Sequence, residues 1–360
     1  MAAFEPALTY HSAIGQSAWL DLLRLLQDRA VGDLRGKPLL KTVGQRHYWY
    51  DRFRLGAEVV DRYIGEDTPD LRDRLARQQA LRDAARASDA AAARLMRVLR
   101  AEGYLTPDVA TGQILSALAG AGTFRLGGTL VGTQAFRMYE GVLGVRIGFD
   151  AAAMTDDIDI ASFERLSVVL QDQTDPALPD AFAALKFDPV PASDPGRVWR
   201  WRQSQRGTLI EFLTPAFGAP EGLRDLPALG VSAQALNFLN YLIADPIAAP
   251  VLYRSGVLAQ IPRPERYAIH KLIVADRRRA GDQKSAKDRA QAAFLIRVLA
   301  EERPHDLADA YQAAITAGPA WRQALDASLS RMPETAARIA GLPGLPRPSE
   351  NRPAPGTDRE

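Results

Sequence analysis

Residues 123–161 decide the fold of this chain, and they read TFRLGGTLVGTQAFRMYEGVLGVRIGFDAAAMTDDIDIA. The stretch opens with short apolar segments, continues with an amphipathic run, and closes on alternating acidic and aliphatic residues. This order predicts a strand that ends at Val131, a helix that begins near Gly132, and a second strand over residues 157–160.

Two acidic residues and a small polar turn carry the chemistry of this stretch. Asp157 and Asp159 project from the same face of a strand, about 6.5–7 Å apart, and such a pair favours Mg²⁺ or Mn²⁺ between them. Gly132 lacks side-chain bulk where a phosphate would approach, and the Thr133 hydroxyl and the helix-start N–H groups are placed to hold it. The pattern predicts a site for a metal ion and a triphosphate, suited to phosphoryl or nucleotidyl transfer. The alternative is an acidic pair near a turn that neighbouring arginines neutralise.

The arrangement resembles the hG[GS]…[DE]h[DE]h signature of the nucleotidyltransferase fold, the DNA polymerase β superfamily, with Thr133 where serine is usual. The resemblance implies an α+β protein with a mixed β-sheet core between helical N- and C-terminal lobes. It also implies a third carboxylate from a neighbouring strand. Glu211 in residues 208–215 (TLIEFLTP) is the best match, because its apolar neighbours are typical of a central strand. A surface glutamate on an edge strand is the alternative.

Residues 264–291 resemble the helical lobe of a bacterial nucleotidyltransferase-like family. More distantly they are similar to the abortive-infection toxin nucleotidyltransferases, which pair a lysine on a helix with a later basic–Asp pair, here Lys271 with Lys287 and Asp288. Lys271 also lies opposite the apolar stripe of its helix, and residues 263–297 hold ten basic and four acidic residues, a polarity that suits a triphosphate. The alternatives are a solvated basic surface and an ion pair along one helix face.

The N-terminal part contains a second candidate surface. Residues 37–64 predict a small three-stranded β-meander, with strands at 39–43, 46–55 and 57–64. Residues 35–54 include six basic residues and one acidic residue, and residues 48–50 read YWY, which is similar to a segment of the same family. One face of the central strand is expected to present Arg46, Tyr48, Tyr50, Arg52 and Arg54. Basic and aromatic side chains together suit single-stranded or hairpin nucleic acid, and packing inside the protein is the alternative.

The rest of the chain is predicted as helices at 17–30, 69–102 and from 264 onwards, with strands and helices alternating in between. The strands of this alternating part are expected at 123–131, 156–161, 199–204, 208–215 and 251–262. We expect four regions: a helical region with the meander (1–112), a nucleotidyltransferase-fold core (113–262), a helical lobe (263–340), and a disordered tail rich in proline and glycine (341–360).

Composition excludes several classes of protein. The 360 residues include no cysteine, which rules out disulfides, thiolate nucleophiles and Cys-ligated zinc, and the four histidines are too scattered for a histidine metal cage. A net charge of +2 is too small to indicate a polyanion partner by itself. The sequence shows no signal peptide and no membrane-spanning segment, so a cytoplasmic location is expected.

These features predict an enzyme, a metal-dependent nucleotidyltransferase that transfers a nucleoside monophosphate from a nucleoside triphosphate to an acceptor hydroxyl. Its cofactor is expected to be Mg²⁺ or Mn²⁺. An RNA end is the first candidate acceptor, while protein hydroxyls and small molecules stay open, and a toxin with an antitoxin partner is implied by resemblance only. The alternative is a non-catalytic nucleic-acid-binding module on the same fold. The expected catalytic and metal-binding residues are Asp157, Asp159 and Glu211, and the expected nucleotide-binding residues are Gly132, Thr133, Lys271, Lys287 and Asp288.

Overall fold

The computed structural model describes residues 7–32, 34, 36–55, 58–148, 157–164, 166, 172–218, 220–278 and 282–345. The chain divides into two compact units, Met1–Pro262 and Arg263–Glu360. The regions predicted at 1–112 and 113–262 both lie in the first unit. The N-terminal helix (residues 13–32) packs against the β-hairpin of residues 247–261, at the end of this unit. Most of the predicted tail lies outside the described residues.

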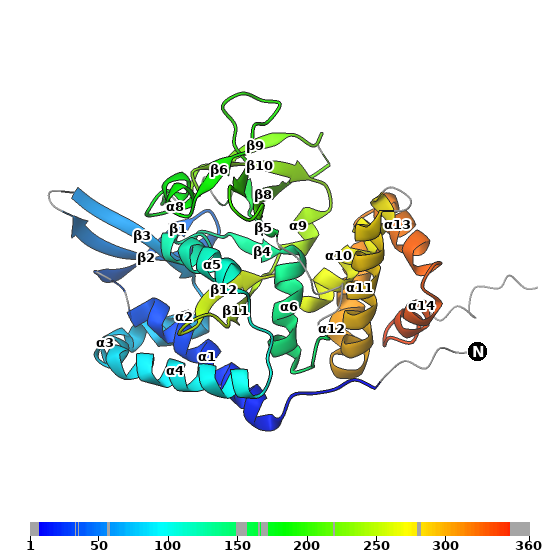
Figure 1. The fold of residues 1–360 in the computed structure, drawn as a ribbon, viewed down its shortest axis with the longest axis horizontal. Helices are drawn as coiled ribbons and strands as arrows, with labels where there is room; N and C mark the ends of the chain where they lie inside the picture. Colours follow the sequence, from blue (N-terminus) through cyan, green and yellow to red (C-terminus); the bar gives the residue numbers. More distant parts are fainter. Residues whose placement is uncertain are drawn as a thin grey trace, which may run out of the picture. The chain divides into compact units, whose positions relative to one another are not determined.

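Four helices form the N-terminal part of the first unit, and α1 lies beside α4 in the ribbon of Figure 1. They are α1 (Ala13–Gly32), α2 (Pro69–Ala76), α3 (Gln78–Asp83) and α4 (Ala85–Ala101). The apolar side of α1, with Trp19 and Leu22, is buried as its periodicity predicts. The helix expected from Pro69 begins there, but the single helix expected over 69–102 is wrong, because the helix is interrupted at Arg77 and Ala84. Neither residue is a proline or glycine, so local sequence carries no stop signal there.

The predicted β-meander is confirmed. Its strands β1 (Lys37–Val43), β2 (Arg46–Leu55) and β3 (Glu58–Glu66) pair antiparallel in that order.

The structure supports the packing alternative for the aromatic residues of the meander. Tyr48 and Tyr50 are only 6% and 2% exposed, and both rings pack edge-on against Tyr63. A later segment also contacts this part of the meander, because Asp172 accepts a hydrogen bond from the Tyr63 amide and pairs with Arg125. The two tyrosines are therefore buried packing residues, and their rings do not present a surface for bases.

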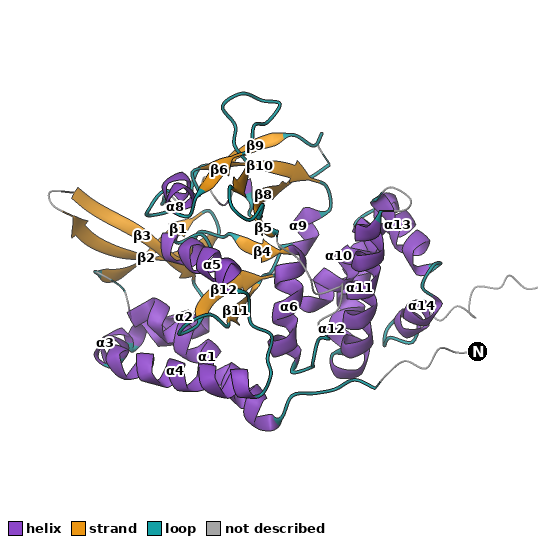
Figure 2. Ribbon diagram, viewed as in Figure 1, coloured by secondary structure: helices purple, strands orange, loops and turns teal. Residues whose placement is uncertain are grey.

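A seven-stranded mixed sheet forms the centre of the first unit, as predicted (Figure 2). Its main path runs β4-β5-β8-β10-β9, while β7 pairs with β8 and β6 pairs with β7. The contacts of β8 with β5 and β10 are parallel, and the others are antiparallel. The strands are β4 (Thr129–Val131), β5 (Ile158–Ala161), β6 (Phe187–Pro189), β7 (Arg200–Gln203), β8 (Leu209–Pro215), β9 (Leu223–Leu226) and β10 (Val231–Leu236).

Two predicted strands differ in the structure. The strand expected over 123–131 is reduced to β4, because Gly122 with φ of +90° ends the preceding helix α5 (Val109–Ala121) in a turn. The strand expected over 251–262 is a hairpin of β11 (Ile247–Val251) and β12 (Val257–Ile261), which forms a separate two-stranded sheet. The remaining helices of this unit are α6 (Gly132–Leu143), α8 (Leu178–Ala184) and α9 (Leu239–Leu242).

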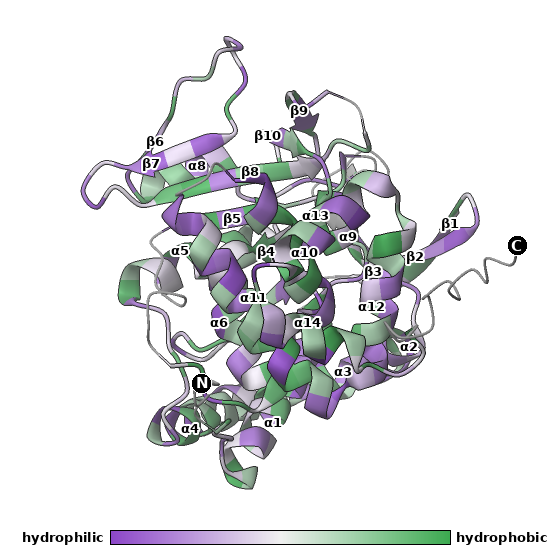
Figure 3. Cartoon of the chain, turned by 90° about the vertical axis from the view of Figure 1, so that its right-hand side faces the viewer, coloured by the Kyte–Doolittle hydropathy of each residue, from purple (hydrophilic) through white to green (hydrophobic). Residues whose placement is uncertain are grey.

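The two faces of the central sheet differ in character. Ile160 and Phe212 are fully buried, and Phe212 packs against the rings of Phe182 and Trp201. Figure 3 shows β8 as mostly hydrophobic. Asp159 on β5 and Glu211 on β8, which alternate with this core, are only half-buried. Side chains alternate along a strand, so the acidic residues of β5 and β8 share the face opposite the aromatic core.

The second unit is helical, as predicted. Its helix α10 packs against three others, and the facing sides of Ile269, Leu272 and Leu295 are fully buried. Proline stands in the first turn of four of these helices, where its missing N–H costs no hydrogen bond. None of the helices in the described part of the chain is long and apolar enough to cross a bilayer. The helices are α10 (Pro264–Arg277), α11 (Gln283–Glu302), α12 (Pro304–Thr316), α13 (Pro319–Leu329) and α14 (Pro333–Ala340).

Candidate active site

The two halves of the sequence signature meet at the junction of β4 and α6. Val131 pairs with Asp159 across the antiparallel strands β4 and β5, so Gly132 follows directly beside this aspartate. Gly132 has φ of +65°, and a Cβ placed on it would lie 2.4 Å from Oδ2 of Asp159. Only glycine therefore allows both this backbone conformation and the close approach of the carboxylate.

The residue that precedes α6 provides no side-chain cap, as is also the case for α3, α4, α8 and α9, whereas α5 and α2 have one. Asp108 accepts hydrogen bonds from the first amides of α5, and Thr68 does the same for α2. The residue at this position in α6 is Val131, whose side chain has no oxygen to offer. The amino end of a helix carries partial positive charge and suits an anion, and Thr133 adds a hydroxyl to this first turn.

Three charged residues form a row across the sheet. Asp159 on β5 is the direct parallel partner of Glu211 on β8, and Glu211 is the direct antiparallel partner of Arg200 on β7. Directly opposed residues point to the same side of a sheet, with strands about 4.8 Å apart. Nη1 of Arg200 lies 3.9 Å from Oε1 of Glu211. Asp157 directly precedes β5, and strand alternation continued to this residue predicts that it shares the face of Asp159.

The acidic side chains near this face have the donor atoms that a divalent cation prefers. Asp157, Asp159 and Glu211 supply carboxylate oxygens on one face of the sheet, the donor type that Mg²⁺ and Mn²⁺ prefer. Among the described residues, no three acidic or histidine side chains converge closely enough to hold a metal ion. The structure thus brings Asp159 against Gly132 and Glu211 beside Asp159, while the three carboxylates are not gathered around one point.

In the second unit, Lys271 and Asp288 are brought together. Nζ of Lys271 lies 2.5 Å from Oδ1 of Asp288, and Nε of Arg278 lies 2.6 Å from Oδ2. The Asp288 side chain is 3% exposed; its burial raises the pKa, but Lys271 and Arg278 more than offset this and hold the pKa below its ordinary value. Lys287, one residue before Asp288, is half-buried. The triphosphate-binding roles expected for Lys271, Lys287 and Asp288 stay predictions.

Residues 109–316 match the model of a protein family described as Nucleotidyltransferase, and the match spans more than half of the chain. The chain belongs to this nucleotidyltransferase family. Residues 18–73 of the nucleotidyltransferase, which include most of α1 and the whole meander, match a second family described as a domain of unknown function (DUF6788).

Curated proteins and solved structures do not refine this family assignment. No curated protein matches the nucleotidyltransferase. A similar solved structure is that of an antigenic nucleotidyltransferase-like protein from Paracoccidioides brasiliensis, with 13% identity over 65% of this chain and 94% of that chain. The TM-score of this match is 0.35, which is too low to establish a shared fold.

Sequence reasoning missed Arg200 as a residue of this face. The sequence contained one indication of this position. The two strands predicted at 199–204 and 208–215 are separated by a short turn with Gly207, and when they pair as a hairpin Arg200 lies opposite Glu211. Gly207 has φ of +72°, which marks the turn. The register across that turn follows from the hydrogen-bonded pairs and is not readable from either strand alone.

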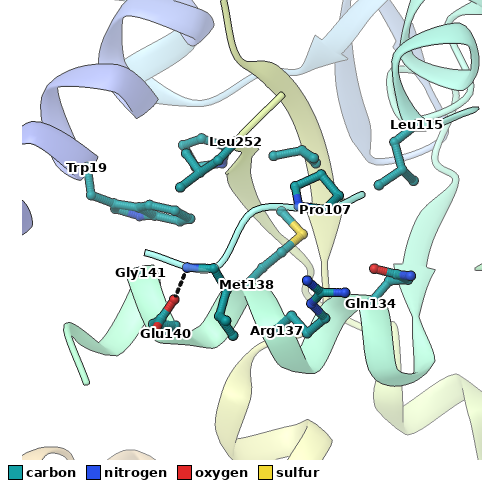
Figure 4. Close-up of a pocket in the computed structure, with 12 residues that line it drawn as sticks. Trp19, Pro107, Leu115, Gln134, Arg137, Met138, Glu140, Gly141 and Leu252 are labelled. Atoms are coloured by element: carbon teal, nitrogen blue, oxygen red, sulfur yellow. Dashed lines mark hydrogen bonds between the residues drawn. The ribbon is translucent and has the colours of Figure 1, made fainter. Parts of the chain in front are cut away.

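A small cavity lies beside α6 of the nucleotidyltransferase (Figure 4). Its volume is about 30 Å³, room for about two water molecules and too little for a nucleotide. Gly132, Thr133 and the acidic residues of β5 and β8 are not among its lining residues, so it is separate from the candidate active site. The side chains around it include Trp19, Leu115, Gln134, Arg137, Met138 and Leu252.

The buried His270 is expected to make the nucleotidyltransferase less stable as the pH falls. Burial lowers the pKa of His270 to about 3, and the neighbouring Lys271 adds to this shift. Below the ordinary value of about 6.5, the unfolded chain takes up a proton that the folded chain refuses until about pH 3. The free energy of unfolding should therefore fall by up to about 1.4 kcal/mol per pH unit in this window.

The measurement is urea denaturation at a series of pH values across that window. His270→Gln removes the titrating group and should flatten the slope by the contribution of one proton. His305→Gln is the matched control, because His305 is exposed on α12, and it should leave the slope unchanged. An equal slope in the wild type and His270→Gln would show that another group causes the acid sensitivity.

Proposed function

We propose that this chain catalyses the metal-dependent transfer of a nucleoside monophosphate from a nucleoside triphosphate to an acceptor hydroxyl. The observation that carries the proposal is the close approach of Asp159 to Gly132, which places a carboxylate against the first residue of helix α6. A phosphate held by the helix start would lie next to a metal-binding oxygen, the combination that this transfer requires. Membership of a nucleotidyltransferase family supports the same reaction class.

Each residue of the face has a proposed role. Thr133 and the amides at the start of α6 would bind the phosphates, and the Asp157 and Asp159 carboxylates would hold Mg²⁺ or Mn²⁺, with Glu211 adjacent on β8. When bound, the cation would neutralise phosphate charge and favour ionisation of the acceptor hydroxyl. The hydroxyl oxygen would form the new bond to the α-phosphorus while the bond to pyrophosphate breaks, and the hydroxyl proton would pass to solvent.

We propose RNA as the acceptor. The support is the basic character of residues 263–297 in the second unit, with ten basic and four acidic residues. A toxin role with an antitoxin partner rests on sequence resemblance alone and stays a prediction.

The test is transfer of label from each of the four α-³²P nucleoside triphosphates, with Mg²⁺ or Mn²⁺, into total RNA and into the protein itself. Wild type is compared with the double variant Asp157→Ala/Asp159→Ala. Label that appears only with wild type would establish the reaction and identify the nucleotide and acceptor class together. Absence of label with every nucleotide, together with absence of metal-dependent nucleotide binding, would overturn the proposal in favour of a nucleic-acid-binding module.

A further inference from the structure

Arg200 is held at the edge of the acidic face in an unusual setting. Its guanidinium lies over the ring of Trp199, 4.5 Å from the ring centre. Its nearest acidic oxygen among the described residues belongs to Glu211, at 3.9 Å, which is too far for a hydrogen bond. The Nε atom is buried and has no hydrogen-bond partner within the described part of the chain. The side chain as a whole is 34% exposed, so a ligand can reach it.

This setting differs from that of an arginine which only neutralises a carboxylate. Such a pair usually forms two parallel hydrogen bonds, as Arg52 does with both oxygens of Asp61 on the meander. Arg200 instead lies over the ring of Trp199, and its closest distance to Glu211 is 3.9 Å. A planar, oriented guanidinium with unused donors is the group that binds a phosphate through two hydrogen bonds.

The position of Arg200 in the row indicates which reactant it meets. The row runs Val131, Asp159, Glu211, Arg200, and Gly132 with the start of α6 lies at the Val131 end. Three strand spacings of about 4.8 Å each separate the two ends, a distance greater than the length of a triphosphate chain. Phosphates bound at the start of α6 therefore leave Arg200 for an anion on the second reactant.

We infer that Arg200 binds a backbone phosphate of a polynucleotide acceptor and thereby positions its terminal hydroxyl at the acidic face. A polynucleotide carries a phosphate next to its reacting hydroxyl, whereas a serine, threonine or tyrosine acceptor carries none. The inference rests on the proposed nucleotidyl transfer, and it narrows the acceptor to one chemical class. Arg200 is a positioning residue in this scheme, since its contact is with the acceptor phosphate and not with the reacting atoms.

The kinetic test compares Arg200→Gln and Arg200→Lys with the wild type in label transfer to total RNA. We expect Arg200→Gln to raise the KM for RNA about tenfold or more, while the KM for the nucleoside triphosphate changes by less than about twofold. Arg200→Lys should recover only part of the loss, because an ammonium group lacks the planar fork. Arg202→Gln is the matched control, since Arg202 is exposed on the same strand and paired with Leu209, and it should behave as wild type.

A binding measurement separates this inference from the proposed reaction. Fluorescence anisotropy of a short, mixed-sequence, fluorescein-labelled single-stranded RNA is followed in the Asp159→Asn background, where turnover is not needed. Arg200→Gln should weaken binding and reduce the slope of log affinity against log salt by about 0.7, the value for one lost phosphate contact on a single strand. This result would support the role of Arg200 even if the wild type transferred no label.

Four outcomes would overturn the inference. They are an unchanged RNA KM and RNA affinity in Arg200→Gln, an increase confined to the KM for the nucleoside triphosphate, equal effects of Arg200→Gln and Arg202→Gln, and wild-type labelling of protein alone. Thermal melting of each variant checks the fold. If the melting temperature of Arg200→Gln is lower than that of the wild type, the test is decided by Arg200→Lys, because this variant keeps the charge. Its KM for RNA and the salt dependence of its RNA affinity are then compared with those of the wild type.

Discussion

Replacing Asp159 by asparagine is expected to lower the rate of nucleotidyl transfer by about a thousandfold or more. The substitution keeps the shape of the side chain next to Gly132 but removes its negative charge. Loss of a carboxylate that holds a catalytic cation removes several kcal/mol of transition-state stabilisation, and each 1.4 kcal/mol is about a factor of ten in rate. The measurement is single-turnover transfer of α-³²P label with Mg²⁺ in excess.

The matched control for this variant is Asp188→Asn. Asp188 is an exposed carboxylate on β6 of the same sheet and lies outside the row of charged residues. We expect this variant to transfer label at a rate within about twofold of wild type. Both variants should melt near the wild-type temperature, because neither changes side-chain volume. Retention of more than a tenth of the wild-type rate by Asp159→Asn would contradict the role assigned to this carboxylate.

Gly132→Ala is expected to lower the transfer rate by about a hundredfold or more and also to reduce stability. The left-handed backbone at φ of +65° costs a non-glycine residue about 1–2 kcal/mol. The added Cβ would also lie 2.4 Å from Oδ2 of Asp159, so the carboxylate must move out of its position beside the start of α6. A misplacement of about 1 Å at a reacting site lowers the reaction rate about a hundredfold. The measurements are the transfer rate and the free energy of unfolding in urea.

Gly230→Ala isolates the backbone part of this effect. Gly230 has φ of +64°, and a Cβ placed on it would meet nothing within 4 Å. We expect Gly230→Ala to lose a similar amount of stability while its transfer rate stays near that of wild type. If the two glycine variants transferred label at the same rate, the contact between Gly132 and Asp159 would have no part in the reaction.

The sequence by itself determined those features that depend on local periodicity and turn chemistry. The strand, glycine and helix around Gly132 and the alternation at Asp157 and Asp159 follow from residues close together in the chain, as do the three strands of the meander. Spacing of two along a strand or of three and four along a helix reflects backbone geometry, which is the same wherever the segment packs. The nucleotidyltransferase signature was therefore readable before its two halves were seen in contact.

Only the tertiary structure decided which residues from distant segments meet. Glu211 stands beside Asp159, and Arg200 beside Glu211, because of strand registers that neither segment encodes alone. Lys271 is held by Asp288 from the next helix, an ion pair that the periodicity of α10 does not reveal. Tyr48 is buried and packs against Tyr63 of the neighbouring strand, a contact that the alternation of its own strand does not reveal. Cross-strand partners and buried faces arise from contacts between different segments, whereas alternation defines only that a strand has two faces.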